Sequence, residues 1–136
     1  MPKGSCLCGV VQIDVRGDMP DPHACHCTMC RKSTGHYGVG ADVPRDQVTI
    51  TGEDNVRWYQ SSETVRRGFC SRCGSPLFFD IPGQDWLGIN LGAFDGPTGT
   101  KTIFHIFVGN KGDYYDIADG LPQYETLPEG VVPNED

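Results

Sequence analysis

Positive charge is scarce in this chain. Eleven Lys and Arg residues face 18 Asp and Glu residues, so the 136 residues carry a formal net charge of −7 at pH 7. Proteins that bind along a nucleic acid backbone use Lys and Arg to neutralise phosphates and release counterions. The acidic balance therefore predicts no nucleic acid partner.

Long apolar runs are also missing. No stretch approaches the roughly 18 consecutive apolar residues of a transmembrane helix, so we expect no membrane partner. The N-terminal stretch MPKGSCLCG lacks the apolar region of a secretory signal. From this we expect a cytoplasmic protein in a reducing compartment, where cysteines remain thiols or metal ligands.

Helical periodicity is the third feature that is nearly absent. Apolar residues instead alternate with polar residues or glycine, and 18 glycines and 10 prolines punctuate the pattern. This pattern predicts strands over residues 11–15, 37–43, 48–50, 87–91 and 103–108, and a helical turn over residues 28–33 only. We expect an all-β fold in a single domain over residues 1–136, with residues 128–136 as a loosely held tail.

Cysteine, in contrast, is abundant and clustered. The seven cysteines form three short motifs, which are Cys6 and Cys8, then Cys25, Cys27 and Cys30, and finally Cys70 and Cys73. Two pairs from distant parts of the chain can close one tetrahedral four-cysteine zinc site, and the triplet can hold a second metal with one position open. Closed zinc sites are structural and open ones are catalytic. The spacing predicts both a scaffold and a reactive centre.

Three other uses of these cysteines compete with metal binding. Disulfides are disfavoured because an odd number of cysteines cannot pair fully within one chain, and cysteines two residues apart rarely fit disulfide geometry without strain. A C-x-x-C motif such as Cys70 with Cys73 is also typical of thiol–disulfide exchange. One of the pairs could instead be buried free cysteine.

A glycine follows the second cysteine of each outer pair, as Gly9 and Gly74. In a zinc knuckle the turn points both sulfurs to one site, and the glycine lets the backbone bend there. We also expect the N–H of Gly74 to approach a cysteine sulfur. Because metal binding contributes directly to folding free energy, this site is predicted to be part of the fold.

The triplet predicts chemistry at sulfur. Three thiolates on Zn²⁺ give a centre of net charge −1, which acidifies water less than a site of three neutral histidines. Such a centre attracts a soft fourth ligand, and a substrate thiol is the natural one. The expected reaction is addition of that thiol to a carbonyl, or its reversal.

A histidine could complete the second site instead of a substrate. His26 stands between two predicted ligands, so we expect its side chain to point away from the metal. His23 lies in a proline-rich turn, and His36 and His105 could approach through the fold. If one of them binds, the site closes and the catalytic hypothesis weakens.

Basic and aromatic residues near the motifs have two interpretations. Arg31 and Lys32 follow Cys30 and could form a solvated turn, or could attract a substrate carboxylate. Arg66 and Arg67 form a second basic pair with the same ambiguity. Three large aromatic residues could belong to the core or line a pocket, namely Trp58, Trp86 and Phe94.

The motifs together resemble the glutathione-dependent formaldehyde-activating enzyme family, also called the centromere protein V family. The resemblance rests on GSCLCG at 4–9, CHCTMCR at 25–31 with STG at 33–35, FCSRCGS at 69–75, and a C-terminal part that includes His105, Lys111 and the sequence GLP at 120–122. It extends to about Tyr124 and implies a β-tent of folded-over antiparallel sheets with zinc knuckles and little helix.

The resemblance also implies two Zn²⁺ sites and an activity. Cys6, Cys8, Cys70 and Cys73 would hold a structural zinc, and Cys25, Cys27 and Cys30 a labile, catalytic zinc. The family's named activity is that of an S-(hydroxymethyl)glutathione synthase, a carbon–sulfur lyase in the reverse direction. The implied small-thiol substrate is glutathione. From their position after Cys30, we expect Arg31 or Lys32 to orient its carboxylate.

Two other classes of function stay open. The chain could be a non-catalytic zinc scaffold that binds a protein partner, or a redox or metal-buffering protein that uses the triplet thiolates. The triplet favours the lyase over the scaffold, because a scaffold needs only the four-cysteine site.

Overall fold

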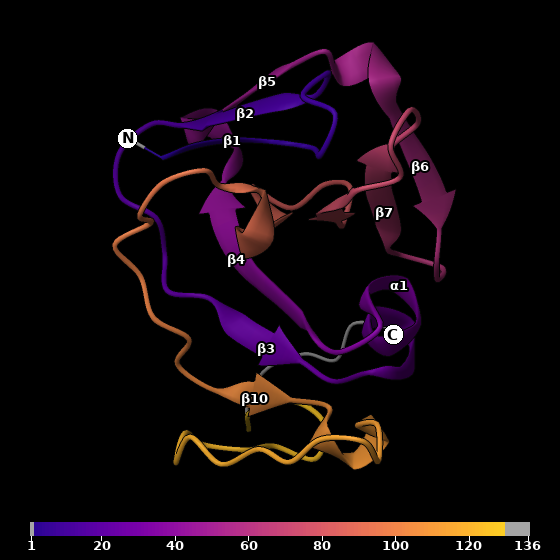
Figure 1. Ribbon diagram of the computed structural model, residues 1–136, viewed down its shortest axis with the longest axis vertical. Helices are drawn as coiled ribbons and strands as arrows, with labels where there is room; N and C mark the ends of the chain where they lie inside the picture. The colour runs from indigo at the N-terminus through magenta and orange to yellow at the C-terminus, as the bar shows by residue number, and fades with distance from the viewer. Residues whose placement is uncertain (1, 130–136) are drawn as a thin grey trace.

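The computed structural model describes residues 2–129, and within this range the regular structure is β-strand apart from one short α-helix and four 3₁₀ turns. Figure 1 shows the arrangement of these elements. The strands are β1 (Lys3–Ser5), β2 (Gln12–Val15), β3 (His23–Cys25), β4 (Gly38–Pro44), β5 (Val48–Thr51), β6 (Val56–Gln60), β7 (Arg66–Cys70), β8 (Pro76–Asp80), β9 (Trp86–Asn90) and β10 (His105–Ile106). The helix is α1 (Thr28–Thr34), and the 3₁₀ turns are η1 (Arg45–Gln47), η2 (Glu53–Asn55), η3 (Leu91–Ala93) and η4 (Val108–Asn110).

The strands form two sheets, which confirms the all-β fold of folded-over antiparallel sheets. A three-stranded sheet has the order β1-β2-β5, and a seven-stranded sheet has the order β10-β3-β4-β9-β8-β7-β6. Neighbouring strands are antiparallel except β10, which pairs with β3 in parallel. In Figure 1 the three-stranded sheet lies at one end of the molecule, and β10 with the segment after it lies at the other.

The core lies where the two sheets face each other. Alternate side chains of β2 point inward, so Ile13 and Val15 are buried while Gln12 is exposed. They belong to one apolar cluster with Ala41 and Val43 of β4 and with residues of β8 and β9. The period-two pattern of residues 12–15 therefore has its expected cause, which is burial of one face of β2.

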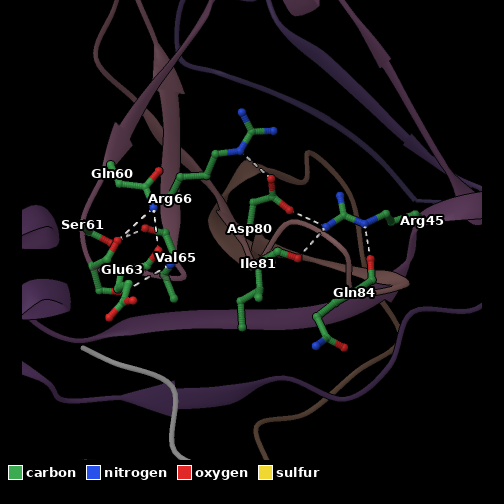
Figure 2. A network of polar contacts seen from close by, with 10 residues as sticks. Arg45, Gln60, Ser61, Glu63, Val65, Arg66, Asp80, Ile81 and Gln84 are labelled. Carbon is green, nitrogen blue, oxygen red and sulfur yellow. Dashed lines mark hydrogen bonds and ion pairs between the residues drawn. The ribbon is translucent and has the colours of Figure 1, made fainter.

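A buried carboxylate ties the end of β8 to two neighbouring segments (Figure 2). Asp80 is 1% exposed and accepts hydrogen bonds from Arg45 of η1 and from Nε of Arg66 of β7, the latter at 2.6 Å. Nε of Arg45 also donates to the carbonyl oxygen of Gln84 at 2.6 Å, and Arg66 lies 3.9 Å from the ring centroid of Trp58. A buried charge is stable only when it is paired in this way.

The predicted elements match the structure with one main correction. Strands appear at four of the five predicted ranges and the helix begins at Thr28 as expected, but the predicted strand over residues 103–108 is wrong for most of its length. Only His105 and Ile106 are in a strand, because Phe107 has a φ of 53° and turns the chain into η4. Ile103 is 42% exposed, so the run is not uniformly buried.

The structure does not fully test two predictions about the chain as a whole, the loosely held tail and the single domain. Most of the predicted tail, residues 130–136, lies outside the described residues, and the single-domain assignment stays a prediction. Within the described range, no helix is long and apolar enough to cross a membrane.

Candidate metal centres

The first centre is the four-cysteine cluster, made of Cys6, Cys8, Cys70 and Cys73. The loop after β1 carries the first pair. Cys70 is the last residue of β7, and Cys73 lies in the turn between β7 and β8. One ligand atom from each residue lies within 4.8 Å of all the others. The fold therefore brings together two motifs that are more than 60 residues apart in the sequence, as the C-x-C and C-x-x-C spacing predicted.

The spacing of these sulfurs fits a zinc ion. The Sγ atoms of Cys6 and Cys8 are 3.6 Å apart, and those of Cys8 and Cys70 are 3.8 Å apart. Four sulfurs at about 2.3 Å from one tetrahedral metal stand roughly 3.8 Å from each other. All seven cysteines are free thiols in the structure, so no disulfide competes for these atoms.

Backbone N–H groups surround the four-cysteine cluster. The N–H of Val11 donates to Sγ of Cys6 at 3.3 Å, and those of Arg72 and Cys73 donate to Sγ of Cys70 at 3.4 and 3.5 Å. Such donors stabilise thiolate charge. Ser75 lowers the pKa of Cys73 to about 5 through its side-chain and backbone hydrogen bonds.

The chain bends at both knuckle glycines as expected, and both are in the left-handed conformation, with φ of 85° at Gly9 and 77° at Gly74. One detail of the prediction is wrong. The N–H of Gly74 donates to the carbonyl oxygen of Cys70 at 2.8 Å and closes the turn. The N–H groups that approach the sulfur of Cys70 come instead from Arg72 and Cys73, which lie within this turn, before Gly74.

The second centre is the cysteine triplet of Cys25, Cys27 and Cys30, whose sulfurs also lie within 4.8 Å of one another. Cys25 ends β3, Cys27 is the N-cap of α1, and Cys30 lies in its first turn. The sulfur of Cys27 accepts the N–H of Cys30 at 3.3 Å, in the manner of an N-cap oxygen. Residues of the C-x-C-x-x-C motif therefore converge because a strand end passes directly into a helix.

No histidine, aspartate or glutamate among residues 2–129 joins either cluster as a further ligand. The triplet thus offers three protein ligands, and its donors are soft thiolates of the type that selects zinc. The prediction that His26 points away from the triplet is confirmed. Its Nδ1 is 2.6 Å from the Tyr115 hydroxyl, and its Nε2 is 2.8 Å from Nδ1 of His105.

The thiols of the triplet differ strongly in acidity. Hydrogen bonds from Cys25 and Cys27, together with the guanidinium of Arg67, lower the pKa of Cys30 to about 3. The same sharing of protons raises the pKa of Cys25, because its partners Cys27 and Cys30 hold the negative charge. Negative charge in the triplet is therefore centred on the sulfur nearest Arg67.

Arg67 is the basic residue in contact with the triplet. Its Nη1 donates to Sγ of Cys30 at 3.5 Å, and its guanidinium lies 5.3 Å from the ring centroid of Phe79. Gly38 of β4 leaves room for the same sulfur, since a Cβ at this position would be 3.3 Å from Sγ of Cys30. The sulfur of Cys30 therefore lies between the backbone of β4 at Gly38 and the guanidinium of Arg67.

Two cavities meet at Cys30 and Arg67. The larger has a volume of about 510 Å³ and includes Arg57, Trp58 and Phe78 in its wall. The smaller has a volume of about 100 Å³ and includes Cys25 and Trp86. A site for a small molecule is usually concave and mostly apolar, with a few convergent polar groups.

The lining of the two cavities shows which of the basic residues near the motifs lies at the site, a question that the sequence left open. Arg67 lines both cavities, whereas neither Arg31 nor Lys32 lines either one. Arg66, the neighbour of Arg67, belongs to the Asp80 network instead. Trp58 has both predicted roles, because it packs against the core and lines the larger cavity.

Sequence reasoning missed Tyr115 and Asp119 and left Arg67 undecided. The alternation of side chains along β7 was the available signal for Arg67, because neighbouring residues of a strand point to opposite faces. No motif marked Tyr115 or Asp119, whose partners His26 and His105 are distant in sequence.

Comparison with known proteins agrees with this geometry. The model of a family described as glutathione-dependent formaldehyde-activating enzyme matches residues 1–110. A Halomonas elongata protein named for glutathione-dependent formaldehyde activation is 30% identical over 126 residues, which cover 85% of this chain and 80% of that protein. An uncharacterized lyase of Schizosaccharomyces pombe is 27% identical over 118 residues, covering 86% of this chain and 85% of the lyase.

A solved structure is also similar. The crystal structure of a Rhodobacter sphaeroides protein matches with a TM-score of 0.59 and 26% sequence identity, over 70% of this chain and 89% of that one.

Proposed function

Because the chain belongs to the glutathione-dependent formaldehyde-activating enzyme family, we propose that it is a zinc-dependent carbon–sulfur lyase for the adduct of a small thiol and an aldehyde. In the synthetic direction the thiol sulfur bonds to the carbonyl carbon. The electron pair of the C=O π bond moves to oxygen, which takes up the proton released by the thiol. The reverse reaction breaks the C–S bond and returns the proton to sulfur. Glutathione and formaldehyde are the proposed pair.

The observation that carries this proposal is the position of the cysteine triplet. Its three sulfurs lie within 4.8 Å of one another, and Cys30 lies in the wall of both cavities. Cys25, Cys27 and Cys30 would hold the catalytic zinc. Zinc bound by three thiolates would supply a Lewis-acidic centre that keeps a thiol deprotonated at neutral pH.

The surrounding residues suit an anionic thiol. Arg67 offsets negative charge at Cys30, and Arg57 adds positive charge to the wall of the larger cavity. That cavity, at about 510 Å³, has room for the body of a thiol such as glutathione. The smaller one, at about 100 Å³, suits a one-carbon aldehyde and is bounded by Phe79 and Trp86, which limit access of water. Placing both reactants beside one sulfur lowers the entropic cost of their encounter.

We assign the four-cysteine cluster to a structural zinc. All four positions of a tetrahedron are filled by Cys6, Cys8, Cys70 and Cys73, so no position is left for a substrate. The two proposed zinc sites therefore differ in the number of protein ligands, and the triplet is also the cluster that lies in the walls of the two cavities described above.

The test follows both binding and turnover in zinc-loaded protein. Glutathione, cysteine and 2-mercaptoethanol are titrated separately, and exchange between the hydroxymethyl thiol and free formaldehyde is measured by NMR exchange spectroscopy. We expect glutathione to bind and exchange to run at least 10-fold above its rate in buffer. Protein treated with a thiol-blocking reagent is the matched control.

The opposite result identifies the alternative. If no thiol binds and exchange equals the rate in buffer, the lyase proposal fails. The chain is then better described as a zinc scaffold that binds a protein partner.

A further inference from the structure

A buried hydrogen-bond chain joins the triplet strand to the C-terminal segment. The chain, here called the histidine chain, runs from the Tyr115 hydroxyl to His26, from His26 to His105 and from His105 to Asp119, with distances of 2.6, 2.8 and 2.8 Å. His26 is 0% exposed and His105 is 3% exposed. None of these residues contributes a ligand to either cluster.

With both imidazoles neutral, one direction of donation satisfies every group. The Asp119 carboxylate can only accept, so Nε2 of His105 donates to it. Nδ1 of His105 then accepts from Nε2–H of His26, and Nδ1 of His26 accepts from the Tyr115 hydroxyl. The carboxylate at one end and the hydroxyl at the other thus fix the tautomer and the orientation of both rings.

A fixed orientation of His26 affects the triplet through the backbone of this residue. It is the residue between Cys25 and Cys27, so its backbone dihedrals set the angle between their two sulfurs. Its backbone N–H is also bound, to the carbonyl oxygen of Ile106 in β10 at 3.0 Å. Figure 1 shows β10 lying beside β3, with the segment that follows it on the outer side.

The ring of His26 is held from its sides as well. Its centroid lies 4.7 Å from that of Tyr37 and 5.5 Å from that of Tyr115. Nζ of Lys111 donates to the carbonyl oxygen of Tyr115 at 2.5 Å, which fixes the backbone that carries the hydroxyl. The ring, its two nitrogens and the backbone of this residue are all constrained by the segment that begins at β10.

We propose that Tyr115, His105 and Asp119 are positioning residues that act through His26 to hold Cys25 and Cys27 in the geometry that binds the second metal. This inference rests on the proposed function. It assigns a role to residues beyond position 110, where the match to the family model ends. The four-cysteine cluster has no residue of the histidine chain among its contacts and serves as an internal reference.

Two conservative substitutions test the proposal without removing a buried ring. Tyr115→Phe deletes only the hydroxyl, and Asp119→Asn removes the charge from a side chain that is 46% exposed. Asp116→Asn and Tyr124→Phe are the controls, because they make the same chemical changes at residues outside the histidine chain. The probe is Co²⁺ alone, which reports thiolate coordination by its charge-transfer and d–d absorption, with Zn²⁺ competition to obtain affinity.

We expect Tyr115→Phe and Asp119→Asn to weaken metal binding at the triplet by roughly 10-fold or more, the usual effect of losing an outer hydrogen bond around a metal site. The Co²⁺ spectrum of the triplet should change, while the four-cysteine spectrum and the melting temperature stay within error of the controls. A merely structural role would lower the melting temperature and leave the spectrum of the triplet as in the parent.

The outcomes separate this inference from the proposed function. If the parent binds two metals and catalyses exchange but both variants match their controls, the positioning role is wrong and the proposed function stands. A fall in melting temperature without a spectral change also overturns it. If the parent binds no second metal, the proposed function fails first and the positioning role with it.

Discussion

The two cysteine clusters use the same ligand atom in contrasting surroundings. In the four-cysteine cluster the sulfurs of Cys6 and Cys70 are in buried residues and accept backbone N–H groups from tight turns. In the triplet the sulfur of Cys30 lies beside Arg67 at the meeting point of two cavities. The first cluster offers four sulfurs to one metal, whereas the second offers three and lies beside two cavities that a small molecule can fill.

This difference shows why ligand number alone does not define a reactive centre. A three-cysteine motif becomes useful for catalysis only when the fold places a cavity against its open side. Here α1 and β4 supply that arrangement, because Gly38 of β4 passes the triplet without a side chain. The predictions below test whether the two clusters are as separate in function as they are in structure.

The largest expected effect is the loss of the fold in Cys73→Ala. Structural zinc sites of this kind contribute about 10–16 kcal/mol of apparent binding free energy, which is comparable to the whole stability of a domain, about 5–15 kcal/mol. We expect insoluble or unfolded protein without metal at the four-cysteine cluster. Metal analysis and thermal unfolding by circular dichroism check this, and a variant that keeps its zinc there and melts like the parent contradicts it.

Cys25→Ala should separate the second cluster from the first. Cys25 ends β3 and is only half-buried, so its removal should leave the sheets intact. We expect the metal content to fall from two to one per chain and formaldehyde exchange to fall to its rate in buffer, with a melting temperature within a few degrees of the parent. Equal loss of both metals would mean that the clusters fold as one unit.

Two adjacent arginines of β7 provide the next comparison. Arg67→Ala should raise the KM for the thiol by roughly 10- to 100-fold, the equivalent of one charge-assisted hydrogen bond of about 1.5–3 kcal/mol. Arg66→Ala should instead lower the free energy of unfolding by about 1–3 kcal/mol, because Asp80 loses one of its two cations.

Steady-state kinetics and urea unfolding of both variants measure the two effects. If Arg66→Ala and Arg67→Ala change KM by the same amount and stability by the same amount, the two faces of β7 do not have separate functions. An effect on KM from Arg66→Ala alone would place the substrate on the opposite face of β7.

Asp80 gives the fold a defined dependence on pH. Burial alone would raise the pKa of Asp80, but hydrogen bonds from Arg45 and Arg66 outweigh it and lower that pKa. A folded-state pKa below the unfolded value, about 3.9, contributes stability that is present above this pH and lost as the pH falls through the folded-state pKa. The contribution is therefore complete near neutral pH.

Asp80→Asn should remove this contribution at pH 7, where we expect a loss of about 2 kcal/mol in the free energy of unfolding. The difference between parent and variant should shrink below about pH 4. Unfolding by urea at a series of pH values measures it, and taking the difference cancels metal release, which both proteins share. A difference that is constant down to the lowest pH would exclude Asp80 as its source.

Much of the fold could be predicted from the sequence because several strands bury one face only. Residues 11–15 and 87–91 alternate clearly, and four of the five residues in each range lie in β2 or β9. The strands β6, β7 and β8 gave no such signal. The segments RRGFC and PLFFD place charged or aromatic side chains on both faces, since one face of this part lines the larger cavity.

The metal centres were more predictable than the substrate surface. Cysteine spacing identified both clusters, because ligands must converge whatever the surrounding fold. The cavity walls include residues of β3, α1, β4, β7, β8 and β9, which are distant in sequence. Alternation along β7 places Arg66 and Arg67 on opposite faces, but only the tertiary arrangement shows that Arg67 is the one beside the triplet. The histidine chain could not be predicted either, because its four members come from three separate segments of the sequence.

The smallest expected effect belongs to Arg31, which the sequence proposed as the residue that orients the substrate carboxylate. Its side chain follows Cys30 on α1 but lines neither cavity, whereas Arg67 lines both. A solvent-screened charge outside the cavity contributes little to binding, about 0–1 kcal/mol. We therefore expect Arg31→Ala to change the KM for glutathione by less than about fivefold. Lys32→Ala tests the other residue of the helix that was predicted for this role, and kinetics of both variants beside Arg67→Ala measure the contrast. If Arg31→Ala has the larger effect on KM, the substrate carboxylate lies over α1, and the boundary of the site extends from the cavities onto the helix.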